Sequence, residues 1–160
     1  MNSVINGYSH FLLLLEKIPS SFIALIGRFS IAAVFWQSGQ TKIEGFTLNL
    51  VKGDFSLGWP RLADSTLFLF KEEYQLPLIA PEIAAVMATT AEHLFPVLLL
   101  LGFATRISAL SLLIMTGVIQ LLVYPGAYAT HGVWASVLLY LLVYGAGKFS
   151  VDWLFIKKQA

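Results

Sequence analysis

Residues 87–102 read MATTAEHLFPVLLLLG, and this stretch decides the fold. Most of it is apolar enough to cross a membrane, yet Glu92 and His93 stand side by side in its middle. Pro96 follows four positions after Glu92 and cannot donate a backbone hydrogen bond to the carbonyl of residue 92. An ionisable residue at the centre of a membrane helix costs about 3 kcal/mol or more, so it is usually paired or functional. The stretch therefore predicts a membrane helix with a polar site at one level.

The whole chain has the composition of a membrane protein. Of its 160 residues 58% are hydrophobic and 12% are charged, whereas soluble domains carry about a quarter charged residues. The net charge of +1 and the lack of a basic patch exclude nucleic-acid binding. The chain has no cysteine, which excludes disulfides, thiolate metal sites and iron–sulfur clusters. A redox role would therefore need a cofactor or a partner protein.

Four apolar stretches are long enough to span a membrane, which takes roughly 20 residues each. They lie near 21–40, 82–102, 106–124 and 131–147. We therefore predict an all-α integral membrane protein, in which residues 1–160 form a single four-helix bundle. The N-terminus lacks the basic segment and cleavage site of a signal peptide. Residues 11–17 predict a short helix lying in the membrane interface.

The connection between the first two spans, residues 41–81, is about 40 residues long and holds five acids and four bases. A short amphipathic helix over about 62–74 would lie on the membrane surface and cover the mouth of the bundle. Lysine and arginine gather at the other side, at the positions Lys17, Arg106, Lys148, Lys157 and Lys158. The positive-inside rule then predicts both termini in the cytoplasm and residues 41–81 outside it.

The first two spans carry a candidate intramembrane polar site made of Arg28, Glu92 and His93. Arg28 lies ~12 Å from the start of the first span and Glu92 ~15 Å from the end of the second, at 1.5 Å per residue. Because the two helices run in opposite directions, we expect an Arg28–Glu92 ion pair. Such a site is either structural glue or a place that binds a ligand or handles a proton. No second ligand stands at helical spacing from His93, so we expect no metal site.

A second group of polar and aromatic residues gathers toward the outer ends of the spans. Interfacial anchoring and close helix packing explain such residues in many membrane proteins. The sharper hypothesis is a pocket for a flat, mostly apolar ligand with polar ends, such as a quinone. Its ring would stack on an aromatic side chain, and its carbonyls would accept hydrogen bonds. The candidate pocket residues are Trp36, Gln37, Lys42, Gln120, Tyr124 and His131.

Three segments resemble signatures of the DoxX family of four-helix membrane proteins. They are GRFSIAAVFWQSGQTK at 27–42, AEHLFPVLLLLGFATRISALSLL at 91–113 and HGVWASVLLYLLVYGAGKFSVDWL at 131–154. The resemblance implies a bacterial inner-membrane protein. It also implies that Arg28, Lys42, Glu92, Arg106, His131 and Asp152 occupy the characteristic polar positions of the family. Lys148 stands where an arginine is commoner in the family. From the residues themselves we expect Asp152 to pair with Arg106 as a structural latch, because both lie on the same side of the membrane.

Three functions are compatible with these patterns. The first is a membrane subunit of a quinone-linked redox system or of an oxidative- or metal-stress system, which would take electrons from a partner protein. The second is a non-catalytic anchor or scaffold for a stress-response complex, with residues 41–81 as the contact surface. The third, a small transporter, ranks last, because four helices with few polar positions give one chain a poor aqueous pathway. The bilayer is the one certain partner, and a homo-oligomer is compatible with the sequence.

Overall fold

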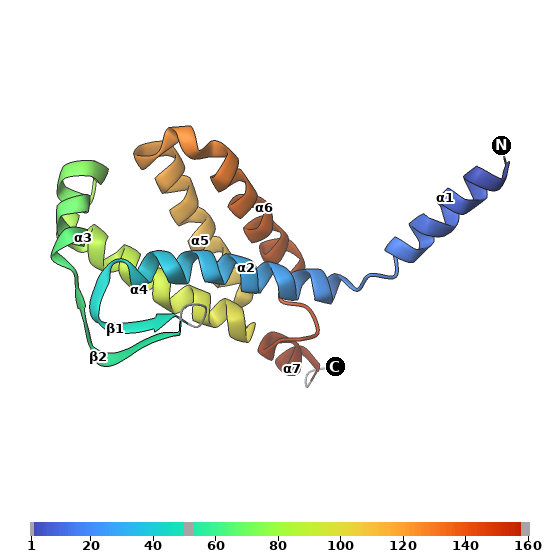
Figure 1. Ribbon diagram of the computed structural model, residues 1–160, viewed down its shortest axis with the longest axis horizontal. Helices are drawn as coiled ribbons and strands as arrows, with labels where there is room; N and C mark the ends of the chain where they lie inside the picture. The colour runs from blue at the N-terminus through green and yellow to red at the C-terminus, as the bar shows by residue number, and fades with distance from the viewer. Residues whose placement is uncertain (1, 50–52, 158–160) are drawn as a thin grey trace.

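The computed structural model describes residues 2–49 and 53–157. It contains four helices that are long and apolar enough to cross a membrane (Figure 1). They are α2 (Ser20–Gln40), α4 (Pro81–Leu101), α5 (Thr105–Val118, continued by a π-helical turn η2, Ile119–Val123) and α6 (Tyr128–Tyr144, preceded by a 3-10 turn η3, Pro125–Ala127). The predicted all-α membrane bundle is confirmed. The fourth span lies earlier than expected, because the chain leaves the helix at Gly145, where φ is +78°.

The four spanning helices pack in a ring, in which α2 and α5 each lie between α4 and α6. Small side chains allow this close approach, since Ala24, Ala32 and Ala109 are buried between larger ones. Phe35, Leu99 and Leu112 fill the centre. Many apolar side chains cover the outside instead, among them Phe29, Ile83, Leu121 and Val133. An apolar exterior around a closed ring of helices is the arrangement expected of a multi-pass membrane protein.

Helix ends follow local signals. Pro81 starts α4 at the position where a missing N–H is harmless. Gly102 ends that helix in the left-handed conformation, with Phe103 N–H bonded to the Leu98 carbonyl at 2.9 Å. The following turn to α5 is only three residues long, which makes α4 and α5 an antiparallel hairpin. The hairpin turn lies within the sequence GFATR at 102–106.

The connection between α2 and α4 contains a β-hairpin that the sequence analysis missed. Strands β1 (Ile43–Asn49) and β2 (Asp54–Leu62) pair antiparallel, with an irregularity between Glu44 and Phe46. Gly45 and Gly58 face each other there, and a Cβ atom at Gly45 would come within 2.4 Å of the Trp59 carbonyl oxygen. The glycine pair and the KGD sequence at 52–54 are the signals that could have revealed it.

After the hairpin, a short helix α3 (Asp64–Phe68) runs into a π-helical turn, η1 (Leu69–Tyr74). This agrees with the amphipathic helix expected near 62–74. Phe70 packs with Ala84 and Ala85 of α4, so one face of the segment is fixed to the bundle. We call residues 64–74 the lid.

The two ends of the chain lie at the opposite end of the bundle from the lid (Figure 1). Helix α1 (Asn2–Leu15) begins earlier and ends two residues sooner than the helix predicted at 11–17, and it extends away from the bundle. Helix α7 (Val151–Lys157) follows α6 through a glycine-rich turn. Lys17, Arg106 and Lys148 lie at this end, as expected, whereas Lys158 falls outside the described residues.

Candidate functional site

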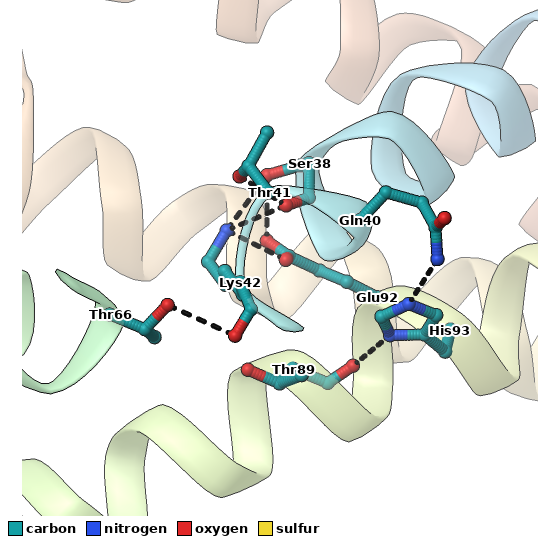
Figure 2. A network of polar contacts seen from close by, with 8 residues as sticks. All are labelled: Ser38, Gln40, Thr41, Lys42, Thr66, Thr89, Glu92 and His93. Atoms are coloured by element: carbon teal, nitrogen blue, oxygen red, sulfur yellow. Dashed lines mark hydrogen bonds and ion pairs between the residues drawn. The ribbon is translucent and has the colours of Figure 1, made fainter. Parts of the chain in front are cut away.

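The centre of the candidate site is a buried ion pair between Lys42 and Glu92. Lys42 Nζ lies 2.7 Å from Glu92 Oε2, and the two side chains are 9% and 4% exposed. Lys42 Nζ also donates to Ser38 Oγ at 2.9 Å and to the Ser38 carbonyl at 3.3 Å, so its three hydrogens all have acceptors. Ser38 Oγ in turn donates to Glu92 Oε1 at 3.1 Å. This small network joins the outer end of α2 to the middle of α4 (Figure 2).

The expected Arg28–Glu92 ion pair is wrong. Arg28 Nη1 donates to the carbonyls of Ala146 and Phe149, both at 2.8 Å, and Nη2 donates to the Leu100 carbonyl at 3.2 Å. Leu100 lies eight residues, or ~12 Å, along α4 from Glu92. The positions of Arg28 and Glu92 along their helices give the depth of the Cα atoms only. The direction of each side chain decides which groups meet.

Helix side chains lean toward the N-terminus of their own helix, and this explains both pairings. On α2 that direction carries the long Arg28 side chain away from Glu92, toward the end at which α4 and α6 finish. The same lean brings Lys42, two residues beyond α2, back along the helix to the level of Ser38 and Glu92. Lys42 is therefore the cation that reaches the acid of α4.

Arg28 is instead balanced by backbone carbonyls at the C-terminal ends of two helices. Leu100 belongs to the last turn of α4, and Ala146 and Phe149 follow α6. Carbonyls at a helix C-terminus carry partial negative charge and lack partners within the helix. A Cβ atom at Gly102 would lie 2.8 Å from Arg28 Nη1 and 2.4 Å from Ser150 Cβ, so the glycine makes room for this arrangement.

The expected Arg106–Asp152 pair is also wrong in its partners. Asp152 accepts from the backbone N–H groups of Ala104 at 2.8 Å and Thr105 at 3.0 Å, and so caps the start of α5. Arg106 Nη2 donates to the Val143 carbonyl at 3.1 Å. Free N–H groups and the positive end of the helix dipole make the α5 terminus a good anchor for a carboxylate. Each residue ties α5 to the chain around the end of α6, without contacting the other.

A cavity of ≈ 600 Å³ opens beside the Lys42–Glu92 pair, between the lid and the halves of the four helices that lie nearest to it. Its wall is mainly apolar and includes Phe35, Met87, Ile114 and Met115. Four of the six residues predicted for an outer pocket line it: Gln37, Lys42, Tyr124 and His131. Glu92, which we had placed in a separate site, lines it too. The two other predicted residues, Trp36 and Gln120, do not line the cavity. Trp36 donates to the Leu48 carbonyl, and Gln120 contacts His131 of the cavity wall.

His131 lies in the cavity wall and is almost fully buried, at 5% exposed. Its Nδ1 is 2.7 Å from Gln120 Oε1, and the Gln120 amide nitrogen donates to the Pro125 carbonyl at 2.6 Å. The amide oxygen must therefore accept, which puts a proton on Nδ1. Nε2 is left as the free basic nitrogen among the contacts of the described residues. Trp134 packs on the ring, with centroids 5.1 Å apart.

His93 turns away from Glu92, toward α2 and the hairpin (Figure 2). Its Nδ1 lies 2.7 Å from the Thr89 carbonyl, which can only accept, so Nδ1 donates and Nε2 accepts from the Gln40 amide at 3.0 Å. The ring also stands edge-on to Trp36, with centroids 5.1 Å apart. Both nitrogens are used, and His93 does not line the cavity. These contacts tie α4 to the end of α2.

The lid closes the outer side of the cavity. Phe70 and Tyr74 line the cavity, and the ring of Tyr74 meets that of Tyr124 at 5.8 Å. The Tyr124 hydroxyl donates to the Glu73 carboxylate. This bond raises the pKa of the Tyr124 phenol well above its ordinary value, and burial raises the pKa of Tyr74. At the base of the lid, Thr66 Oγ1 and Ala63 N–H donate to the Lys42 carbonyl, both at 3.0 Å.

Several cavity features were missed from the sequence. The two π-helical turns, η1 and η2, both border the cavity, and π-turns often mark functional sites. Their local sequences, LFKEEY and IQLLV, carry no signal that distinguishes them from ordinary helix. Ser38 could have been found, because it lies four residues before Lys42 and so on the same helical face. Within the described residues, no three His, Asp or Glu side chains come together as a metal site.

Comparisons with known proteins agree with this architecture. A family model described as DoxX matches residues 23–125, which include α2, the lid, α4 and α5. A protein of Haemophilus influenzae, described as uncharacterized, is 32% identical over 153 residues. That match covers 90% of this chain and 89% of the relative. No solved structure gave a significant match.

Proposed function

The chain belongs to the DoxX family, and from this premise we propose that it is a small membrane subunit that binds a quinone beside the Lys42–Glu92 pair. One observation carries the proposal: a buried ion pair forms part of the wall of an otherwise apolar cavity of ≈ 600 Å³. Small-molecule sites have volumes of about 300–1,000 Å³. Ionisable residues at membrane depth generally mark functional sites, and a purely structural pair would not need to border a cavity.

The lining of the cavity fits the chemistry of a quinone. A quinone has a flat apolar ring with a carbonyl oxygen at each end, and Phe35, Tyr74 and Trp134 offer aromatic faces for the ring. The Lys42 ammonium would donate to one carbonyl. Its longest contact, 3.3 Å to the Ser38 carbonyl, is the one that a ligand oxygen would replace. His131 would serve the other end of the ring through Nε2.

In the proposed reaction a quinone takes up two electrons and two protons and becomes a quinol. The electrons would come from a partner protein that carries a redox cofactor, so this chain would act as a subunit. Glu92 and His131 are the groups that would exchange the two protons with the quinone oxygens. Such a subunit fits a quinone-linked respiratory system or an oxidative- or metal-stress system.

The proposal includes a location in the bacterial inner membrane with both termini in the cytoplasm. Its support is the gathering of Lys17, Arg106 and Lys148 at the end of the bundle opposite the lid. Because the chain has no cysteine, a single introduced cysteine reports its side cleanly. We expect a membrane-impermeant thiol reagent to label Asp54→Cys in intact spheroplasts and to label Lys17→Cys only after lysis. The reverse pattern would place the lid in the cytoplasm.

Quinone binding is tested with protein purified in lipid nanodiscs. We expect the wild type to bind ubiquinone or menaquinone at one molecule per chain and Glu92→Gln to bind about tenfold more weakly, the effect of losing one charged hydrogen-bond partner. Glu82→Gln is the matched control, because it makes the same change on the same helix at an exposed side chain. Equal affinity of all three proteins, or no bound quinone in the wild type, would refute the proposal.

A second candidate function is that of a scaffold for a stress-response complex, with the hairpin as its contact surface. Phe55, Leu57 and Trp59 alternate along β2, and Leu57 and Trp59 are 85% and 89% exposed. Phe55 and Leu57 lie on one face of the hairpin, since alternate strand residues point the same way, and Trp59 follows in the irregular stretch. If the hairpin recruits a partner, replacing the three side chains by serine should abolish co-purification of that partner and leave quinone binding intact. Unchanged co-purification would exclude this role.

A further inference from the structure

A second cavity, of ≈ 640 Å³, lies at the other end of the bundle, where α5 begins and α6 ends. Its lining includes the cations Arg106 and Lys148, the hydroxyl residues Ser21 and Thr105, and Asp152. It is separate from the quinone cavity, and nothing in the proposed function uses it. The arrangement of its polar groups shows which kind of ligand it would accept.

The polar groups of this cavity are hydrogen-bond donors in need of an acceptor. Both carboxylate oxygens of Asp152 accept hydrogen bonds from backbone N–H groups at the start of α5. Within the described residues, no carboxylate lies in ion-pair distance of Arg106 or Lys148. Arg106 donates one N–H group to the Val143 carbonyl, and its other N–H groups remain able to donate to a ligand. The two cations of this cavity therefore outnumber Asp152, the one carboxylate in its lining, and form no ion pair with it.

Two buried hydroxyl groups add to the set of donors. Thr105 is fully buried, and its Oγ1 has no hydrogen-bond partner among the described residues. Ser21 Oγ accepts from the Lys148 N–H at 3.0 Å, so its own hydrogen remains to be donated. An unpartnered buried hydroxyl is unfavourable by about 1–3 kcal/mol unless something bonds to it. Two hydroxyls and two cations around one cavity match the oxygens of a phosphate group.

The rim of the cavity indicates where the phosphate comes from. Ile107, Tyr144, Trp153 and Phe155 line the cavity and are exposed on the outside of the bundle. Apolar and aromatic side chains at this level would contact acyl chains and the headgroup region. We propose that this cavity binds the phosphate of an anionic phospholipid, with the acyl chains lying along the outside of α5 and α6.

The test is native mass spectrometry of the full chain with phosphatidylglycerol and, for comparison, phosphatidylcholine. The wild type should retain phosphatidylglycerol in preference, and Arg106→Gln/Lys148→Gln should lower its affinity roughly thirtyfold, the effect of two basic residues at a lipid surface. Arg61→Gln/Lys71→Gln is the matched control, because it removes two cations from the other end of the bundle and should keep the preference. Equal losses in both double variants, or equal retention of the two lipids by the wild type, would overturn the proposal.

Two further measurements separate the remaining explanations. Thr105→Val removes one hydroxyl at nearly constant volume and charge, so it tests the site even if the double variant is unstable. It should weaken phosphatidylglycerol binding about tenfold or more, the effect of one lost hydrogen bond to a charged group. Unchanged binding in Thr105→Val would contradict the site. Inorganic phosphate at millimolar concentration should not displace the lipid. Displacement would show that the site takes free phosphate and overturn the lipid assignment.

Discussion

The bundle buries one cation at each end, and the two ends balance their charges differently. Arg28 is 2% exposed and gives its N–H groups to three backbone carbonyls at the ends of α4 and α6. Lys42 is nearly as buried, but its partner is the Glu92 carboxylate, and both residues line a cavity. Arg28 lines neither of the two cavities described above, although Ala146, one of its acceptors, lines the second cavity.

The difference teaches which polar residue in a membrane bundle serves the fold and which serves a ligand. Backbone carbonyls cannot change their protonation state, so the contacts of Arg28 are permanent and fix helix ends in place. A carboxylate can exchange its proton and its partner, so the Lys42–Glu92 pair can respond to what enters the cavity. The comparison predicts that substitution of Arg28 changes folding, and that substitution of Lys42 or Glu92 changes quinone binding as well.

The largest effect is expected for Arg28→Met. One buried and two partly buried carbonyls would lose their donor, and a buried unsatisfied group costs about 1–3 kcal/mol, so the free energy of unfolding should fall by about 3 kcal/mol or more. Many membrane proteins would not tolerate such a loss. The measurement is the yield and thermal unfolding of the protein in detergent, with the exposed Arg61→Met as control. A stable, monodisperse Arg28→Met protein would contradict the claim that Arg28 holds the helix ends together.

The next effect separates charge balance from ligand binding. Glu92→Leu leaves the Lys42 ammonium buried without its carboxylate and should destabilise the protein by about 3–5 kcal/mol. The double substitution Lys42→Met/Glu92→Leu removes both charges and should recover most of that stability. Quinone binding should remain lost in the double variant. Recovery of binding together with stability would show that the pair is only structural.

A smaller effect is expected where α2 and α4 approach most closely, beside the pair. A Cβ atom at Gly39 would lie 2.8 Å from His93 Cε1 and 3.1 Å from Glu92 Cβ, so Gly39→Ala should destabilise the protein by about 1–3 kcal/mol. Gly117 of α5 has open space around it, and Gly117→Ala should stabilise by up to about 1 kcal/mol through helix propensity alone. Thermal unfolding of the two variants checks both signs, and equal shifts would contradict the tight packing at Gly39.

The smallest effect concerns the lid. Tyr124→Phe removes the hydrogen bond to Glu73, a contribution of about 1 kcal/mol, and should speed hydrogen exchange across residues 64–74. Because the folded-state pKa of Tyr124 is raised, its contribution is complete below the ordinary phenol pKa of about 10 and is lost only at higher pH. Lid protection should therefore be constant from about pH 6 to 9 in the wild type. A loss of protection within that range would indicate another titrating group.

The sequence predicted the bundle well, because length and apolar composition decide a membrane span. Each of the four predicted spans corresponds to a helix, and four of the six pocket residues line the cavity. The pairing of charges was beyond the sequence, since depth along a helix says nothing of where a long side chain turns. Arg28 and Lys42 show this directly, because both side chains reach toward the N-terminus of α2. As a result Lys42, and not Arg28, pairs with Glu92.

The lid and the hairpin show the same contrast between what a sequence predicts and what it does not. The amphipathic pattern at 62–74 predicted a helix, and a helix is there, although its second half winds as a π-turn. The hairpin depends on Gly45 and Gly58 meeting across two strands, a contact between distant residues that the glycines and the KGD sequence only hint at. The sequence indicated that Asp152 anchors this end of the bundle but gave the wrong partner. Its partners are backbone N–H groups, which every residue type except proline has, so the sequence does not identify them.

The most direct test of the account is to locate the quinone by photo-crosslinking. An azidoquinone would be bound to the protein in nanodiscs, activated by light and mapped by peptide mass spectrometry. The account predicts labelling of cavity-lining residues such as Met87, Met115 and Trp134, suppressed by excess unlabelled quinone and absent in Lys42→Met/Glu92→Leu. Labels confined to lipid-facing residues such as Leu121 and Val133, or unchanged in that variant, would contradict a quinone site beside the Lys42–Glu92 pair.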